Sequence, residues 1–180
     1  MPDLQPHPTT QLGAVTVTAQ AERYGTQLLL RFDVTGAVDR IEIPPPASAP
    51  TRRDGLWRNT CFEAFIRPAR SPAYQELNLS PSGDWAYYHF EDRRSGMSSP
   101  DLAAPAIEFA ARADGLSLRA SLDLATLVSP AVPWDLALSA VLEGSDGATS
   151  YWALAHPPEG PPDFHDPDCF VLHLPPPAAE

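Results

Sequence analysis

The chain has 180 residues, 43% hydrophobic and 19% charged, which suits one globular domain with its own core and argues against disorder. Its formal net charge of −11 disfavours nucleic acid and anionic membrane surfaces as partners, because both are themselves negatively charged. No stretch approaches the roughly 20 apolar residues that span a bilayer, and the first residues lack the features of a signal peptide. The sequence therefore predicts a cytoplasmic protein.

Proline accounts for 22 residues and interrupts nearly every long segment, which disfavours helices because proline removes a hydrogen bond and clashes with the preceding turn. Apolar and polar residues alternate instead with a period of two, which is typical of strands. In chain order, the predicted strands cover residues 14–19, 28–34, 38–43, 61–67, 74–80, 84–90, 107–112, 116–122, 134–142, 151–155 and 170–174. The only helix expected is a turn or two near residues 124–128.

Many short strands separated by turn signals such as SPSGD and EGSDG favour a β-sandwich or a barrel. We expect an all-β, jelly-roll-like β-sandwich of about 10–11 short antiparallel strands with minimal helix. A single domain is predicted over residues 1–174, followed by a disordered, proline-rich tail over residues 175–180. Two long proline-rich connections, residues 44–56 and 156–168, are candidates for functional loops.

The two cysteines, Cys61 and Cys169, lie far apart in the sequence and in no spacing typical of metal ligands. Because the sequence carries no export signal, a disulfide is disfavoured. Both cysteines are predicted to be buried free thiols.

Polar chemistry collects on the three consecutive predicted strands between residues 61 and 90. Consecutive strands are commonly neighbours in a sheet, so alternate residues of all three are expected to share one face. The residues expected on that face are Glu63, Glu76, Asn78, Trp85, Tyr87 and His89. Carboxylates and an amide beside aromatic rings are typical of a face that binds a small ligand, although the rings could also simply cover the sheet.

Catalytic interpretations have less support. Glu63 and Glu76 could form a glycosidase-like acid–base pair, and His165 beside Asp166 permits a catalytic triad. However, the sequence contains no nucleophile elbow, phosphate-binding glycine loop or HExxH motif. The histidines show no metal-ligand spacing, and a structural calcium ion in an acidic loop is possible without any EF-hand pattern to place it. We therefore expect binding without catalysis.

Three segments carry a family resemblance: LWRNTCFEAFIRP, YQELNLSPSGDWAYYHF and YWALAHPPEGPPDFHDPDCFVLHL. They resemble the DOMON-like domains of bacterial proteins, which in turn resemble the family 9 carbohydrate-binding modules of xylanases. The similarity runs from about residue 55 to residue 174. It implies a sandwich fold that binds either a sugar or a b-type haem, because both kinds of ligand occur on this fold.

In the sugar-binding modules, two Trp rings clamp a terminal sugar while carboxylate and amide groups read its hydroxyls. By resemblance, Trp57 corresponds to the first ring, Glu63 to the acidic residue and Asn78 to the amide. Phe164 stands in the place of the second Trp, and Glu76 stands where the modules carry Arg, which inverts a charge in the pocket. The implied ligand-binding residues are Trp57, Glu63, Glu76, Asn78, Phe164, His165 and Asp166.

Two alternatives to sugar binding remain open. A b-type haem would need axial ligands such as Met97 with His89 or His165. The domain could also be an interaction or scaffold module without a small ligand. The sequence favours the first interpretation: a module that binds a small polyhydroxy ligand such as a sugar, without a cofactor.

Overall fold

The computed structural model describes residues 1–10 and 14–177, which form eleven strands and no α-helix. The strands are β1 (Asp3–Pro6), β2 (Val15–Tyr24), β3 (Gln27–Gly36), β4 (Cys61–Pro68), β5 (Tyr74–Leu79), β6 (Trp85–Phe90), β7 (Ala106–Arg112), β8 (Gly115–Asp123), β9 (Trp134–Glu143), β10 (Thr149–Ala153) and β11 (Leu172–Leu174). Short 3₁₀ turns lie at η1 (Val38–Arg40), η2 (Leu56–Arg58) and η3 (Pro167–Cys169).

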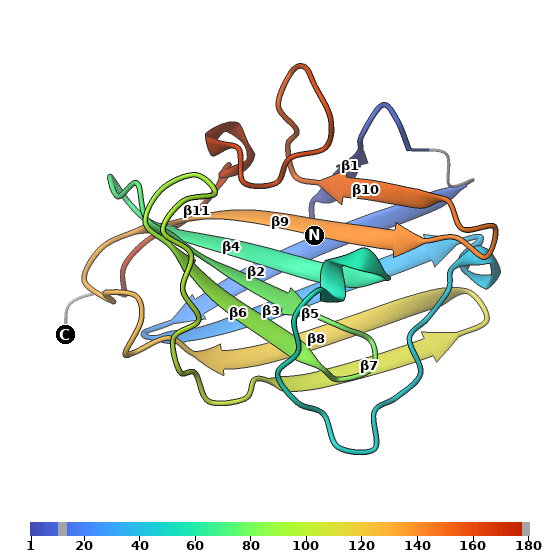
Figure 1. Ribbon diagram of the computed structural model, residues 1–180, viewed down its shortest axis with the longest axis horizontal. Helices are drawn as coiled ribbons and strands as arrows, with labels where there is room; N and C mark the ends of the chain where they lie inside the picture. The colour runs from blue at the N-terminus through green and yellow to red at the C-terminus, as the bar shows by residue number, and fades with distance from the viewer. Residues whose placement is uncertain (11–13, 178–180) are drawn as a thin grey trace.

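All strand pairings are antiparallel, in the order β6-β5-β4-β9-β10-β1-β2-β3-β8-β7, with β11 paired to the free part of the β9 edge. The sheet curls into two layers that pack face to face, and β1 joins them because it pairs with β10 on one side and β2 on the other (Figure 1). We call β6, β5, β4, β9, β10 and β11 the covered sheet, and β2, β3, β8 and β7 the open sheet. The predicted all-β sandwich is confirmed.

The main core lies between the two layers. Every second residue of β3 is buried there, and Phe32 from the open sheet packs on Phe62 from the covered sheet with ring centroids 5.2 Å apart. Trp134 closes one end of this core beneath the guanidinium of Arg23, which lies 3.6 Å from the ring centroid. Each large apolar side chain buried in this way contributes about 1.5–3 kcal/mol. The period-two pattern of the sequence is thus the pattern of core contact.

One predicted strand, residues 38–43, is wrong. The chain forms the 3₁₀ turn η1 there, followed by a single bridge between Ile41 and Gly144. Val38 and Ile41 are the buried pair, and the amide of Ile41 donates to the carbonyl of Val38 at 3.1 Å. A spacing of three residues places both side chains on one side of a helical turn, whereas a strand would point them to opposite faces.

β1 was not predicted, because its four residues include a proline and show no alternation long enough to identify. Near residues 124–128 the expected helix does not form: the chain makes a single hydrogen-bonded turn, in which the amide of Val128 donates to the carbonyl of Leu124 at 3.0 Å.

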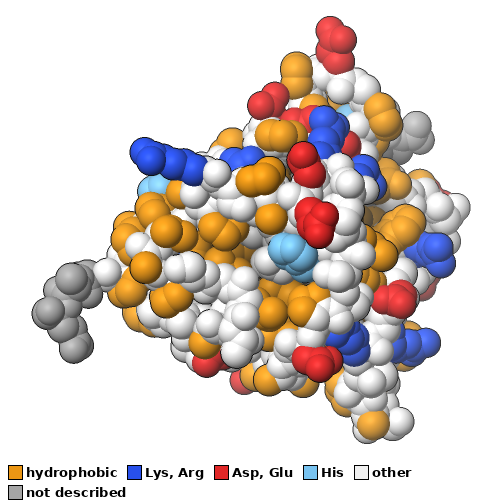
Figure 2. Space-filling view, turned by 60° about the vertical axis from the view of Figure 1, so that its left-hand side comes forward, with side chains coloured by type: hydrophobic (Ala, Val, Ile, Leu, Met, Phe, Trp, Pro, Cys, Tyr) orange, Lys and Arg blue, Asp and Glu red, His pale blue; other side chains and the backbone are white. Residues whose placement is uncertain are grey.

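Cys61 and Cys169 are buried free thiols, as predicted. None of the helical segments in the described ranges is long and apolar enough to cross a membrane. On the face seen in Figure 2, hydrophobic, acidic and basic side chains are intermingled, so its described part shows no broad basic area. Of the predicted disordered tail, residues 178–180 lie outside the described residues, and the carbonyl of Pro175 accepts a hydrogen bond from Arg23.

Candidate functional site

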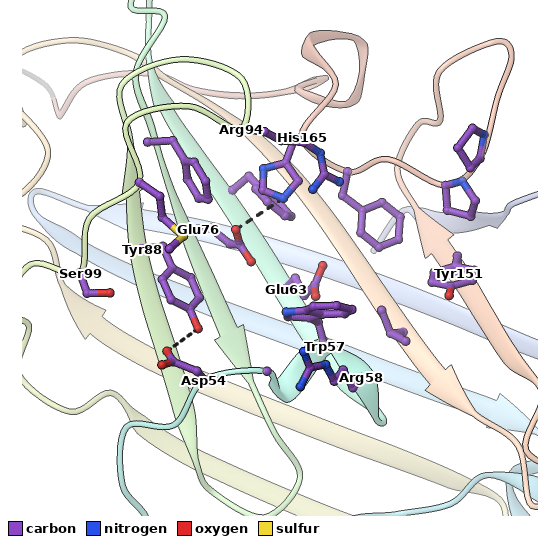
Figure 3. A pocket seen from close by; sticks show the side chains of 18 residues that line it. Asp54, Trp57, Arg58, Glu63, Glu76, Tyr88, Arg94, Ser99, Tyr151 and His165 are labelled. Carbon is purple, nitrogen blue, oxygen red and sulfur yellow. Dashed lines mark hydrogen bonds and ion pairs between the residues drawn. The ribbon is translucent and has the colours of Figure 1, made fainter.

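A cleft of about 960 Å³ lies on the outer face of the covered sheet, the face turned away from the main core. Its floor is formed by β4, β5, β6 and β9, and its walls by residues 44–60, 91–105 and 154–171 (Figure 3). These loops explain an unusual feature of the floor: β5 is buried along its whole length and β4 along its first six residues. A strand is buried on both faces only when something packs on each of them.

Two acidic side chains, Glu63 from β4 and Glu76 from β5, lie in this floor and line the cleft. In the register of the two strands, Glu63 is opposite Asn78 while Glu76 is opposite Phe65, so the two carboxyl groups occupy diagonal positions on one face. Both are buried, and Glu63 is only 3% exposed. The structure therefore brings together the two carboxyl groups that the strand pattern placed on a common face.

Glu76 has hydrogen-bond donors near both of its oxygens. Its Oε1 accepts from the Asn78 amide at 2.7 Å, and its Oε2 lies 3.6 Å from Nε2 of His165. On the other side of the His165 ring, Nδ1 lies 2.7 Å from the Tyr74 hydroxyl, which accepts from the backbone amide of Arg94. Burial lowers the pKa of His165 to about 4, so its ring is neutral at neutral pH.

Glu63 has fewer partners. The Ser139 hydroxyl donates to its Oε2 at 3.1 Å. Burial, and secondly the charge of Glu76, raises the pKa of Glu63 to about 8, so that it holds its proton at neutral pH. Burial also raises the pKa of Glu76, but the hydrogen bond from Asn78 and the charge of Arg94 act in the opposite direction. The floor thus carries one carboxylic acid beside one group better suited to be the carboxylate.

Arg94 is the charged cleft residue with the strongest influence on the acidic pair, and the sequence did not reveal it. It follows β6 in a left-handed backbone conformation (φ 52°), lines the cleft, and pairs with Asp163 of the facing loop at 2.9 Å. Its positive charge partly offsets the rise that burial causes in the pKa of Glu63 and of Glu76. No motif surrounds it, so only the meeting of two loops could identify it.

Two other arginines near the acidic pair in the sequence, Arg58 and Arg67, take different positions. Arg58 does line the cleft, with its guanidinium 5.2 Å from the Trp57 ring centroid. Arg67 does not, because its guanidinium stacks 4.3 Å from the Phe170 ring centroid, where it packs the loop onto the sheet.

Aromatic side chains form the walls. Gly55, in a left-handed conformation (φ 77°), turns the chain into η2, which presents Trp57 with 49% of its side chain exposed at the cleft. Phe164 enters from the opposing loop and lies 6.3 Å from Tyr151 between ring centroids. The loop that carries Trp57 is fixed to β6 by a hydrogen bond of 2.8 Å from the Tyr88 hydroxyl to Asp54.

Five of the seven predicted ligand-binding residues line the cleft: Trp57, Glu63, Glu76, Phe164 and His165. The other two do not. Asn78 lies on the same side of β5 as Glu76 but is fully buried and outside the cleft lining, and its amide donates to Glu76. Asp166 lies outside the cleft, where it accepts a hydrogen bond from the Asp168 amide at the start of η3 and pairs with Arg93 at 2.8 Å.

The expected face of β6 is wrong. Tyr88 is opposite Glu76 and Ala86 is opposite Asn78, so both lie on the cleft side of β6, and Tyr88 lines the cleft. Trp85 and Tyr87 face the main core. The reason is the register with β5: Tyr87 is opposite Leu77 and Trp85 is opposite Leu79, and both leucines pack in the main core. His89 follows the same alternation and bonds Gln75 on the core side at 2.8 Å.

The remaining expectations find no matching arrangement. In residues 1–10 and 14–177, no group of three or more His, Cys, Asp or Glu side chains is arranged to hold a metal ion. The hydroxyl bonded to His165 belongs to Tyr74, so the His165–Asp166 pair does not form a triad with a serine. Met97 lines the cleft but His89 lies on the other face of the sheet, which separates that pair of possible haem ligands.

No family model matches the chain, and no curated protein matches it in sequence. Solved structures do share its fold. A Bacteroides uniformis protein provisionally assigned as carbohydrate-binding superposes with a TM-score of 0.64 and 14% identity, over 93% of this chain and 83% of that one. A family 9 carbohydrate-binding module from Caldicellulosiruptor kristjanssonii, solved with cellotriose, superposes with a TM-score of 0.50 and 12% identity, over 84% of this chain and 71% of that one. At these identities the likeness concerns the fold, and it leaves the DOMON-like resemblance as a prediction.

Proposed function

We propose that this protein binds a small carbohydrate in the cleft without cleaving its glycosidic bonds. The observation that carries the proposal is a half-exposed Trp57 ring beside a floor of buried carboxyl groups, which is the combination a sugar requires. The proposal is supported by the fold that the chain shares with carbohydrate-binding proteins, one of them a module solved with a bound oligosaccharide.

The cleft matches the two kinds of surface that a pyranose presents. Its apolar C–H faces stack on aromatic rings, and Trp57 and Phe164 supply such rings from two different loops. Its hydroxyl groups need both acceptors and donors. Glu76 can accept from one hydroxyl and the protonated Glu63 can donate to another, and each hydrogen bond to a charged group contributes about 1.5–3 kcal/mol.

The floor favours a neutral ligand. An acidic sugar on the floor would place a second negative charge beside Glu76, where Arg94 is already paired with Asp163. Arg58, the other arginine of the cleft, lies at the wall beside Trp57. We therefore expect neutral sugars to bind more tightly than the corresponding uronic acids, and cationic amino sugars to be tolerated.

A b-type haem fits the cleft poorly. Of its possible axial ligands, Met97 and His165 both line the cleft. However, Nδ1 of His165 is bonded to Tyr74, and Nε2 faces Glu76. One ring nitrogen is thus hydrogen-bonded and the other lies beside a carboxyl group, so protein expressed with added haem should stay colourless, with no Soret band.

The central test is the Trp57→Ala variant. Binding of glucose, xylose, cellobiose and chitobiose would be measured by calorimetry and intrinsic fluorescence. Trp57→Ala should weaken binding at least about tenfold, because one stacked ring contributes about 1.5 kcal/mol or more. Its unfolding free energy should change by no more than about 1 kcal/mol, because an exposed ring packs little on the core.

Tyr24→Ala is the matched control, because Tyr24 is a more exposed ring at the end of β2 and lies outside the cleft. It should bind as the unmodified protein does. Equal binding by Trp57→Ala would remove the ring from the site, and failure of every sugar to bind would refute the proposal.

A further inference from the structure

The two carboxyl groups of the cleft floor differ in what surrounds them. Glu76 has a donor near each oxygen, from Asn78 and from His165. Glu63 accepts from Ser139 at Oε2 alone, and no donor within the described residues is hydrogen-bonded to its Oε1, although the side chain is almost completely buried and lines the cleft. Donors stabilise a carboxylate, so an almost completely buried side chain with a single donor favours the protonated acid.

A series of hydrogen bonds leads from the Arg94 amide through Tyr74 to His165, beside Glu76, and its donors and acceptors have a defined direction. The Tyr74 hydroxyl accepts from the Arg94 amide, which favours donation of its own proton to Nδ1 of His165. The ring then carries its proton on Nε2, the nitrogen that faces Glu76. The hydrogen bond from Asn78 and the charge of Arg94 favour the carboxylate form of Glu76, and the raised pKa of Glu63 agrees with the opposite assignment for that group.

The position of the pair restricts the chemistry it could perform. In a glycosidase the two carboxyl groups flank the scissile bond from opposite sides. Here both come from neighbouring strands on one face, at diagonal positions whose β-carbons are about 7 Å apart, so both reach a ligand from the same side. Two carboxyl groups on one side of a ligand can exchange protons with two oxygens that are bonded to the same carbon. The anomeric hydroxyl and the ring oxygen of a reducing sugar are such a pair.

We propose that Glu63 and Glu76 act as an acid–base pair that opens the hemiacetal ring of a bound reducing sugar and so interconverts its two anomers. This inference rests on the proposed sugar binding and goes beyond it. Proton transfer by two positioned groups is what such a ring opening requires.

In the opening step, the Glu76 carboxylate takes the proton of the anomeric hydroxyl. That oxygen forms a carbonyl with the anomeric carbon as the bond to the ring oxygen breaks, and Glu63 gives its proton to the ring oxygen. After the carbonyl has rotated, the ring oxygen attacks its other face and returns a proton to Glu63, while Glu76 returns its proton to the former carbonyl oxygen. Both residues are restored, and no oxidant or other co-reactant is consumed.

The test measures binding and anomer exchange in the same samples. Freshly dissolved α-D-glucose, or whichever reducing sugar of the panel binds most tightly, would be followed by polarimetry at increasing protein concentration. The rate should increase in proportion to protein. It should decrease as the pH rises through about 8, where Glu63 loses its proton, and again in acid, where Glu76 gains one.

Glu63→Gln and Glu76→Gln keep the shape of the side chain but cannot exchange a proton. Each should lose at least about 100-fold of the protein-dependent rate while still binding sugar, because a positioned acid or base contributes about 10²–10⁴-fold. Glu108→Gln, an exposed glutamate on β7 of the open sheet, should keep the full rate.

The outcomes separate this inference from the function on which it rests. Sugar binding without any acceleration would overturn the acid–base role and leave the binding function intact. Acceleration that survives in Glu63→Gln and Glu76→Gln would overturn the residue assignment. Absence of binding would refute the proposed function itself. If a variant fails to fold, the pH dependence of the unmodified protein still decides, since a rate that stays constant through about pH 8 contradicts the role of Glu63.

Discussion

The outer faces of the two sheets have similar sequence patterns but very different surroundings. On the open sheet, the outward side chains of β8 remain exposed or half-exposed, as with Arg119 and Ser117. On the covered sheet, the outward side chains of β4 and β5 are buried under three loops, and a second apolar cluster around Phe65 and Phe170 lies there. Loops that cover a polar face turn it from a solvated surface into a site with altered acidity.

Ion pairs show the same contrast. Arg31 and Asp33 pair at 2.8 Å on the open sheet, where both side chains contact solvent. Asp163, above the covered sheet, pairs with Arg93 at 2.6 Å and Arg94 at 2.9 Å and so joins two of the loops that form the cleft. The Arg31–Asp33 pair lies on an exposed surface, whereas the pairs of Asp163 connect the loops that form the cleft walls.

The two outer faces should differ most in the unfolding free energy that is lost when an apolar side chain is removed. Phe65, 1% exposed, packs on Tyr74, His165 and Phe170. Phe65→Ala should cost about 3–5 kcal/mol of unfolding free energy, because the loops cannot refill the cavity. Leu29→Ala on the open sheet, where Leu29 is 38% exposed, should cost less than about 1 kcal/mol. Urea unfolding measures both, and equal losses would show that the covered face is not a second core.

The second largest difference between the two faces should be in how stability depends on pH, because Glu63 is buried on the covered sheet. The unfolded chain releases the Glu63 proton near the ordinary value of 4.5, whereas the folded protein holds it until about pH 8. Between these values, rising pH stabilises the unfolded state, which ionises, relative to the folded state, which does not. The contribution of Glu63 to stability is therefore complete below about pH 4.5 and is lost as the pH rises to about 8. Thermal unfolding should show the melting temperature falling across this window.

Two variants isolate that effect. Glu63→Gln should flatten the decline in melting temperature, while Glu108→Gln on the open sheet should leave it unchanged. A decline that is as steep in Glu63→Gln as in the unmodified protein would assign it to another group.

The smallest effect should come from the ion pairs. Asp163→Asn should cost about 1–2 kcal/mol, because it removes charge-assisted hydrogen bonds to two arginines and loosens the cleft wall. Asp33→Asn should cost less than about 1 kcal/mol, as is usual for an exposed pair. Urea unfolding at low salt compares them, and sugar affinity should fall only for Asp163→Asn. A loss of affinity in Asp33→Asn would contradict the separation of the two faces.

Much of this molecule could be predicted from local patterns. The alternation of apolar and polar residues identified β3, β8 and β9, and the proline content excluded long helices. Both predictions succeeded because each depends only on residues close together in the sequence. The pairing of β4 with β5 followed from their adjacency in the chain, and it placed Glu63 and Glu76 on one face.

Other features escaped the pattern for identifiable reasons. The faces of β6 were exchanged, because alternating aromatic rings on both sides give no sign of which set enters the core. Asn78 was expected among the ligand-binding residues, and it lies beside Glu76 but outside the cleft lining, a difference of burial that residue type does not encode.

The sequence by itself determined the all-β fold and the acidic pair in neighbouring strands, since each depends on local backbone preference or on short-range order along the chain. Only the tertiary structure decided that three loops cover this face, that Arg94 meets Asp163, and that the two glutamates differ in acidity. These features arise from contacts between residues distant in the chain, and a buried carboxyl group takes its properties from what surrounds it in space.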